Sequence, residues 1–68
     1  MAIRITLDDM LAKRRLSLVE LSDRTGISVR HLTLLRDQEA LAVRLKTLEA
    51  LCRALNCGPG ELMRYNKE

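Results

Sequence analysis

The side chains with the clearest chemical capacity in this sequence lie in the segment 28–37, SVRHLTLLRD. Arg30 and Thr33 are three residues apart, so on a helix they occupy neighbouring positions of one face. A guanidinium donates two parallel hydrogen bonds to paired acceptors such as a carboxylate, a phosphate or the O6 and N7 edge of guanine. Threonine offers a hydroxyl and a methyl group. The pattern indicates recognition of a polar partner by one face of a helix.

Residues that serve in metal binding or nucleophilic catalysis are scarce. Cys52 and Cys57 are five positions apart and His31 is the one histidine, which gives too few ligands for a structural zinc site. Neither thiol has a neighbouring base in the sequence that would activate it. We therefore expect two buried or half-buried thiols, a surface imidazole, no cofactor, no metal and no enzymatic activity.

Two short amphipathic helices are predicted to hold the Arg30 face in place. Ser17 is followed three residues later by Glu20, which is the pattern of a capping box at a helix start. Gly26 falls where the chain has to reverse, and glycine accepts a positive φ without steric cost. Ser28 is a second N-cap candidate. Segment 17–36 therefore has the outline of a DNA-binding helix-turn-helix.

The orientation of the second helix follows from its apolar residues. Leu32 and Leu35 are three apart and are expected to face inward, toward the first helix of the motif. Steps of 100° per residue then turn the rest of the helix outward. The outward positions are Arg30, Thr33, Leu34 and Asp37, with Val29 at the margin.

Together with their spacing, these residues resemble the Cro and phage-repressor type of helix-turn-helix, the Xre family, over nearly the whole chain. The resemblance implies an all-α, compact four- to five-helix DNA-binding domain spanning residues 1–68, with short strands expected at its two ends. It also implies a sequence-specific transcriptional regulator whose partner is double-stranded DNA. The matching residues are Leu21, Ser22, Gly26, Ile27, Leu32, Leu35, Ala42, Arg44, TLEALCRAL (47–55) and CGPGEL (57–62).

The resemblance assigns roles to individual positions. The recognition helix, about 29–36, is expected in the major groove, with base contacts from Val29, Arg30, Thr33 and Leu34. Basic residues beside it match positions that hold phosphates in the family. The full set of expected DNA-binding residues is Ser17, Leu18, Ser28, Val29, Arg30, Thr33, Leu34, Arg36, Arg44 and Lys46.

Some residues depart from the family pattern and favour an alternative function. Leu18 stands where the family usually has Gln, and Asp37 and Glu39 place carboxylates where phosphates are expected to approach. Leu34 and Leu41 add apolar side chains on the same side. The alternative is an antitoxin-like or co-regulator-like protein-interaction module, which has the helix-turn-helix fold, docks a protein partner on Leu18, Leu34 and Leu41, and binds DNA weakly.

Length and composition limit the remaining possibilities. The 68 residues have no Trp, no Phe and one Tyr, so the core must be aliphatic. A core this small supplies about 3 to 5 kcal/mol, which makes stabilisation by a homodimer plausible. The net charge of +3 permits nucleic-acid binding. No run of eighteen apolar residues and no signal peptide is evident, so we expect a cytoplasmic protein without membrane contact.

Outside the motif, the two ends and two further helices complete the predicted fold. Residues 2–6 alternate apolar and polar side chains, as in a half-buried strand, and residues 62–65 are the best pairing partner, within one chain or across a dimer. A first helix begins near Leu7 and ends in the basic run 13–15. A later helix, ending at Asn56, presents its core face through Leu48, Leu51, Cys52 and Leu55.

Overall fold

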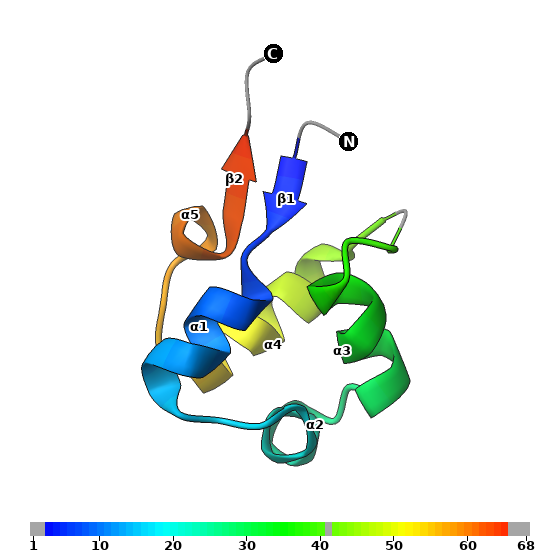
Figure 1. Cartoon of the computed structure of the whole chain (residues 1–68), viewed down its shortest axis with the longest axis vertical. Coiled ribbons are helices and arrows are strands. Elements are labelled where there is room, and N and C mark those ends of the chain that lie inside the picture. Colours follow the sequence, from blue (N-terminus) through cyan, green and yellow to red (C-terminus); the bar gives the residue numbers. More distant parts are fainter. Residues whose placement is uncertain (1–2, 41, 66–68) are drawn as a thin grey trace.

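The computed structural model describes residues 3–40 and 42–65. Helices α1, α2, α3 and α4 surround an aliphatic core, and a two-stranded sheet projects from one end of the body (Figure 1). This arrangement confirms the predicted all-α domain with short terminal strands. In chain order the elements are β1 (Ile3–Ile5), α1 (Leu7–Arg14), α2 (Leu18–Thr25), α3 (Val29–Arg36), α4 (Leu45–Leu55), α5 (Pro59–Leu62) and β2 (Met63–Tyr65).

The predicted capping chemistry sets the bounds of α2 and α3. The Ser17 hydroxyl accepts a hydrogen bond from the Glu20 amide, and the Glu20 carboxylate accepts one from the Ser17 amide, which completes the capping box. Gly26 ends α2 in the left-handed region, with φ of 76°. The Ser28 hydroxyl accepts from the His31 amide and starts α3. The turn between the two helices is therefore as short as predicted.

The core is built almost wholly from leucine. All of the main helices contribute to it, and α5 adds one residue, so the single cluster ties the motif to the rest of the molecule. Leu32 and Leu35 are fully buried, as their spacing predicted. The buried residues are Leu7, Met10, Leu11, Leu21, Leu32, Leu35, Leu48, Leu51, Leu55 and Leu62.

The two terminal strands pair with each other within one chain. β1 and β2 are antiparallel, with Ile3 opposite Tyr65 and Ile5 opposite Met63. Just beyond the strands, the Thr6 amide donates to the Leu62 carbonyl at 2.7 Å. Of the two pairings that the sequence left open, the structure thus has the one within a single chain.

One arginine of the basic run 13–15 joins α1 to the end of α4. Arg14 Nε donates to the Leu55 carbonyl at 2.7 Å, and its terminal nitrogen donates to the Asn56 carbonyl at 3.3 Å. These carbonyls belong to the last turn and C-cap of α4, which have no helical donor. Asn56 itself is left-handed, with φ of 51°, and ends α4 at the predicted position. Arg14 therefore has a structural role in the fold.

Candidate nucleic-acid interface

Three side-chain hydrogen bonds in the corner between α2 and α3 fix the angle of the motif. The Ser22 hydroxyl, on α2, donates to the Ile27 carbonyl at 2.6 Å. The Thr25 hydroxyl donates to the Leu21 carbonyl at 2.8 Å and accepts from the Ile27 amide at 3.2 Å. These bonds satisfy the polar groups of a turn that is too tight to form its own backbone ladder. The corner therefore presents α3 as a rigid part of the body.

The outer face of α3 is exposed to solvent at positions in both halves of the helix. Val29 is 39% exposed and Leu34 is 36% exposed, while Arg30 is also exposed. The Arg30 guanidinium forms no hydrogen bond or ion pair with any residue in the ranges 3–40 and 42–65. No group in these ranges occupies the N–H donors of the Arg30 guanidinium. They can therefore make a bidentate contact with a base or a phosphate.

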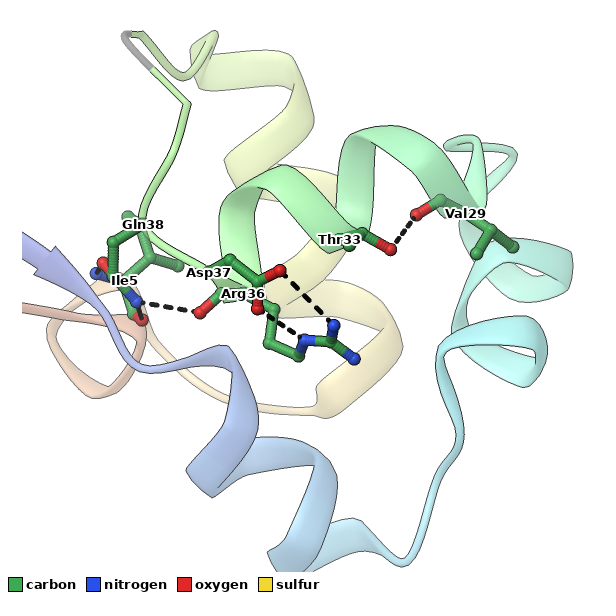
Figure 2. Close-up of polar contacts among 6 residues, drawn as sticks. All are labelled: Ile5, Val29, Thr33, Arg36, Asp37 and Gln38. Atoms are coloured by element: carbon green, nitrogen blue, oxygen red, sulfur yellow. Dashed lines mark hydrogen bonds and ion pairs between the residues drawn. The ribbon is translucent and has the colours of Figure 1, made fainter.

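Thr33 lies on the same face, but part of its hydroxyl is already in use. Its Oγ1 donates to the carbonyl of Val29 one turn earlier at 2.8 Å (Figure 2). A hydroxyl has one proton, so Thr33 cannot donate to a phosphate without giving up this bond. What it presents outward is its methyl group and its remaining acceptor capacity. This favours contact with a thymine methyl over contact with a phosphate.

At the end of α3, Arg36 is paired with its neighbour Asp37. The guanidinium donates to the two carboxylate oxygens at 3.0 and 3.4 Å (Figure 2). This hydrogen bond, followed by the attraction of the Asp37 charge, raises the pKa of Arg36 above its ordinary value. Asp37 thus loses most of its capacity to repel a phosphate, and Arg36 loses part of its capacity to bind one.

Gln38 fastens the end of α3 to the first strand. Its side-chain oxygen accepts from the Ile5 amide at 2.8 Å, and its side-chain nitrogen donates to the Ile5 carbonyl at 2.6 Å. The same nitrogen donates to the Arg36 carbonyl at 3.1 Å. Figure 2 shows the amide group of Gln38 beside β1. Gln38 therefore occupies the edge of β1 as a third strand would, and we call this set of bonds the Gln38 clamp.

The other predicted site residues lie at the N-terminal ends of α2, α3 and α4. The hydroxyls of Ser17 and Ser28 cap α2 and α3, so each accepts an amide of its own helix. Leu18 is half-buried and packs against the core. Arg44, the N-cap of α4, and Lys46, in its first turn, are exposed. The fold thus places two basic side chains on the segment that follows α3.

The sequence over residues 6–68 matches the family model described as the Cro/C1-type HTH DNA-binding domain. The chain belongs to this family. It is 50% identical over all 68 residues to a relative in Bacillus subtilis (strain 168), the uncharacterized HTH-type transcriptional regulator YozG, and covers 81% of that protein's length. No solved structure matches the chain. The match confirms the predicted resemblance, and it shows a DNA-binding domain of the Cro/C1 type.

Within this family fold, the leucine surface proposed for a protein partner is smaller than the sequence suggested. Leu18 packs against the core instead of forming part of an open patch. Leu34 is 36% exposed, which is ordinary for a single surface leucine. Leu41, the third member, lies outside the described residues. The departure at Leu18 therefore contributes to packing, and Leu34 lies on the same α3 face as Arg30.

Sequence reasoning missed the two side-chain roles at the end of α3. Asp37 was predicted as an outward residue whose carboxylate opposes the approach of a phosphate, and Gln38 had no predicted role. In the structure Asp37 pairs with Arg36, and Gln38 holds β1. Gln38 has a left-handed backbone, with φ of 63°. No local signal marks this conformation, because glutamine is not among the residues that favour it.

The cysteines and acidic residues show no metal site in the described ranges. Cys52 and Cys57 are free, half-buried thiols, as predicted. Burial, and then the neighbouring Cys52, raise the pKa of the Cys57 thiol above its ordinary value. Among residues 3–40 and 42–65, no group of three His, Cys, Asp or Glu side chains could hold a metal ion. The helices of this part of the chain are also too short or too polar to cross a membrane.

Proposed function

We propose that this chain is a sequence-specific DNA-binding transcriptional regulator, consisting of one domain over residues 1–68, that inserts α3 into the major groove. The observation that carries the proposal is the exposed outer face of α3, where the exposed Arg30 guanidinium forms no bond with the described residues. The capping bonds and the core fix the position of α3. Arg30 on this helix therefore has both the N–H donors and the solvent access that base recognition requires.

Base recognition is assigned to the outer face of α3. Arg30 donates to O6 and N7 of a guanine, a contact worth about 1 to 3 kcal/mol of discrimination. Thr33 turns its methyl group toward a thymine methyl, since its proton is bonded to Val29. Val29 and Leu34, both partly exposed, add apolar contact to neighbouring thymines. The preferred site then combines one guanine with adjacent A·T pairs.

Phosphate contacts are assigned to the two sides of this face. Arg44 and Lys46 are exposed and lie just after the recognition helix and its loop. The amides at the N-terminal ends of α2 and α3, beside Ser17 and Ser28, favour negative charge. Arg36 contributes only when a phosphate displaces Asp37, so its contribution is smaller than that of an unpaired arginine. These contacts fix the register of the helix on the duplex and carry no sequence information.

The functional unit is proposed to be a homodimer in the cytoplasm. Two copies related by a two-fold axis place their α3 helices in successive major grooves roughly 34 Å apart, so the binding site is an inverted repeat. A second copy also adds buried surface to a domain whose single core is small.

Selection of duplexes from a random pool tests this function. We expect enrichment of an inverted repeat that the protein binds at least about a thousandfold more tightly than unselected DNA, measured by fluorescence anisotropy at two salt concentrations. Absence of enrichment, with weak and salt-sensitive binding to every duplex, would refute the proposal and direct attention to a protein partner.

Three alanine variants separate base contacts from phosphate contacts. Arg30→Ala should weaken binding to the selected site by about 1 to 3 kcal/mol and remove the preference at one base pair. Arg44→Ala should weaken binding to all duplexes equally and lower the salt slope by about one. Arg53→Ala is the matched control, since Arg53 is an exposed arginine on α4 that already pairs with Glu49 at 3.1 Å. This control should leave affinity and preference unchanged.

A further inference from the structure

The two cysteines of the chain meet where α4 ends. Asn56, at the C-cap, is left-handed, and two backbone hydrogen bonds reverse the chain around it. The Asn56 amide donates to the Arg53 carbonyl at 3.4 Å, and the Cys57 amide donates to the Cys52 carbonyl at 3.0 Å. These two bonds form a Schellman motif, in which the residue after the left-handed one commonly packs its side chain against the residue whose carbonyl it binds. In α4 these two residues are Cys57 and Cys52.

The end of α1 has the same motif with leucines in the two positions. Arg15 is left-handed, and its amide donates to the Ala12 carbonyl at 3.3 Å. The Leu16 amide donates to the Leu11 carbonyl at 3.0 Å, and both leucine side chains belong to the core or pack against it. The motif therefore needs only an apolar contact at these positions. The thiols of α4 bring a chemical capacity that the turn itself does not require.

The two thiols interact with each other and are accessible to small reagents. Burial is the largest cause of the raised pKa of Cys57, and the charge of Cys52 is the next, so the two sulfur atoms lie within electrostatic reach. Glu61 acts in the same direction, and the Arg14 guanidinium opposes it. Both thiols are free, and both side chains are only half-buried. The pair is therefore a dithiol that solvent can reach.

The backbone around the two thiols suits a disulfide. The 3.0 Å bond joins the Cys57 nitrogen to the Cys52 oxygen. With standard bond lengths on either side of this bond, the two Cα atoms are at most about 7 Å apart, which is within the range that a disulfide spans. Arg14 donates to the Leu55 and Asn56 carbonyls between them, so the backbone of this loop is already fixed. A bridge then requires rotation of the two side chains and no rearrangement of the fold.

We propose that Cys52 and Cys57 form a dithiol site that hydrogen peroxide oxidises reversibly to an intramolecular disulfide. The thiolate of one cysteine attacks a peroxide oxygen, which forms an S–O bond, breaks the O–O bond and releases hydroxide. The hydroxide takes up the proton that this thiol lost on ionisation. The second thiol then attacks the sulfenic sulfur, which forms the S–S bond and releases water. The two sulfur atoms lose two electrons in total, and the peroxide is reduced to two molecules of water.

This site is separate from the residues assigned to DNA. The corner between α4 and α5 lies beside α1, whereas α3 lies on the other side of the body (Figure 1). The inference therefore goes beyond the proposed function and does not depend on it. In a reducing compartment a disulfide of this kind is usually transient and forms in response to an oxidant. The site would thus record exposure of the protein to peroxide.

Equilibrium oxidation of the full chain tests the geometry of the site. Native and urea-unfolded chains are equilibrated in mixtures of reduced and oxidised dithiothreitol, and the free thiols are then alkylated and counted by intact mass spectrometry. Because the native turn holds the thiols together, we expect the disulfide to be at least about tenfold more favourable in the native chain, which lowers its reduction potential by about 30 mV. By linkage, the equilibrium constant for unfolding of the oxidised chain should be smaller than that of the reduced chain by the same factor.

Peroxide treatment of the reduced native chain tests the chemistry. One equivalent should give a monomeric product that has lost two hydrogen atoms, keeps the native circular dichroism spectrum and returns to the dithiol with dithiothreitol. Cys52→Ser and Cys57→Ser are the matched controls, since each should stop at a sulfenic acid that dimedone traps.

Several results would overturn the proposal. They are equal disulfide constants in the native and unfolded chains, a disulfide that forms only between chains or only with loss of helix content, and a native chain that peroxide leaves reduced or converts to sulfinic acid without a disulfide. None of these measurements uses DNA, so failure here is distinct from failure of the random-pool selection.

Discussion

Gln38 stabilises the fold through its side-chain hydrogen bonds and destabilises it through its left-handed backbone. Two substitutions at this residue separate these effects. Gln38→Ala removes three hydrogen bonds, two to the backbone of Ile5 and one to the Arg36 carbonyl. It keeps the left-handed backbone, whose φ of 63° is unfavourable for any residue with a Cβ. Gln38→Gly removes the same three bonds but relieves the backbone. Comparing the two variants therefore isolates the bonds from the strain.

The expected free energies follow from these features. The clamp is exposed, so each bond is assigned the low end of the usual net range, about 0.5 kcal/mol, and the three together about 1.5 kcal/mol. Relief of the left-handed φ is worth about 1 kcal/mol. Gln38→Ala should thus lower the free energy of unfolding by about 1.5 kcal/mol and Gln38→Gly by only about 0.5 kcal/mol. The order of stability is native, then glycine, then alanine.

Urea unfolding followed by far-ultraviolet circular dichroism measures this order. Glu39→Ala is the control, because an exposed substitution outside the clamp should stay within about 0.5 kcal/mol of the native protein. Amide exchange at Ile5 adds a local readout, since its N–H is bonded to Gln38 and should exchange faster in both variants. A glycine variant less stable than the alanine variant would contradict a strained backbone at Gln38. An alanine variant with unchanged stability and an unchanged Ile5 exchange rate would contradict a stabilising role of the three bonds.

Three further predictions concern single positions. Arg15 ends α1 with a left-handed φ of 54°. Arg15→Gly should therefore stabilise the domain by about 0.5 to 1 kcal/mol and raise Tm, whereas Arg15→Ala should not. Calorimetry measures the Tm of both variants. Ser17→Ala breaks the capping box and should cost about 1 kcal/mol in a urea melt, whereas Ser17→Asp should restore most of it. The raised pKa of Cys57 means that the thiol of the unfolded chain ionises first. Stability should therefore fall as alkaline pH rises, and in a Cys52→Ser background iodoacetamide should modify native Cys57 with a higher pH midpoint than the urea-unfolded chain; equal midpoints would contradict this.

The parts of the fold that were predicted correctly depend on short-range chemistry. Ser17 and Glu20 are three residues apart, and Gly26 and Ser28 act on the helices beside them, so their bonds follow from local spacing. The bounds of α3, Val29–Arg36, agree with the predicted recognition helix for the same reason. Its inward face follows from the period of the helix, since Leu32 and Leu35 have no other place to be buried.

The parts that were not predicted depend on contacts between distant residues. Gln38 and Ile5 are 33 positions apart, and nothing in the spacing of either residue indicates that they meet. Leu18 could be judged only from the sequence position at which the family has a polar residue, whereas its packing depends on the assembled core. Arg36 and Asp37 are neighbours in the sequence. Whether their charges pair depends on the side-chain rotamers, which the sequence alone does not determine. The roles assigned to residues in DNA binding remain predictions, because the partner that would contact these residues is outside the chain.

The pairing of β1 with β2 has a consequence for how this protein is made. The first strand, residues 3–5, is matched by residues 63–65, and the buried side chain of Leu62 comes only a few positions earlier. A growing chain can form α2 and α3 from neighbouring residues long before this, but it cannot close the body until the segment around residue 62 has left the ribosome. At about 5 to 20 residues per second, several seconds separate the synthesis of β1 from that of its partner strand, and the core lacks Leu62 during that time. A stalled or truncated product that lacks residues 62–65 is therefore the form most exposed to proteases and to aggregation.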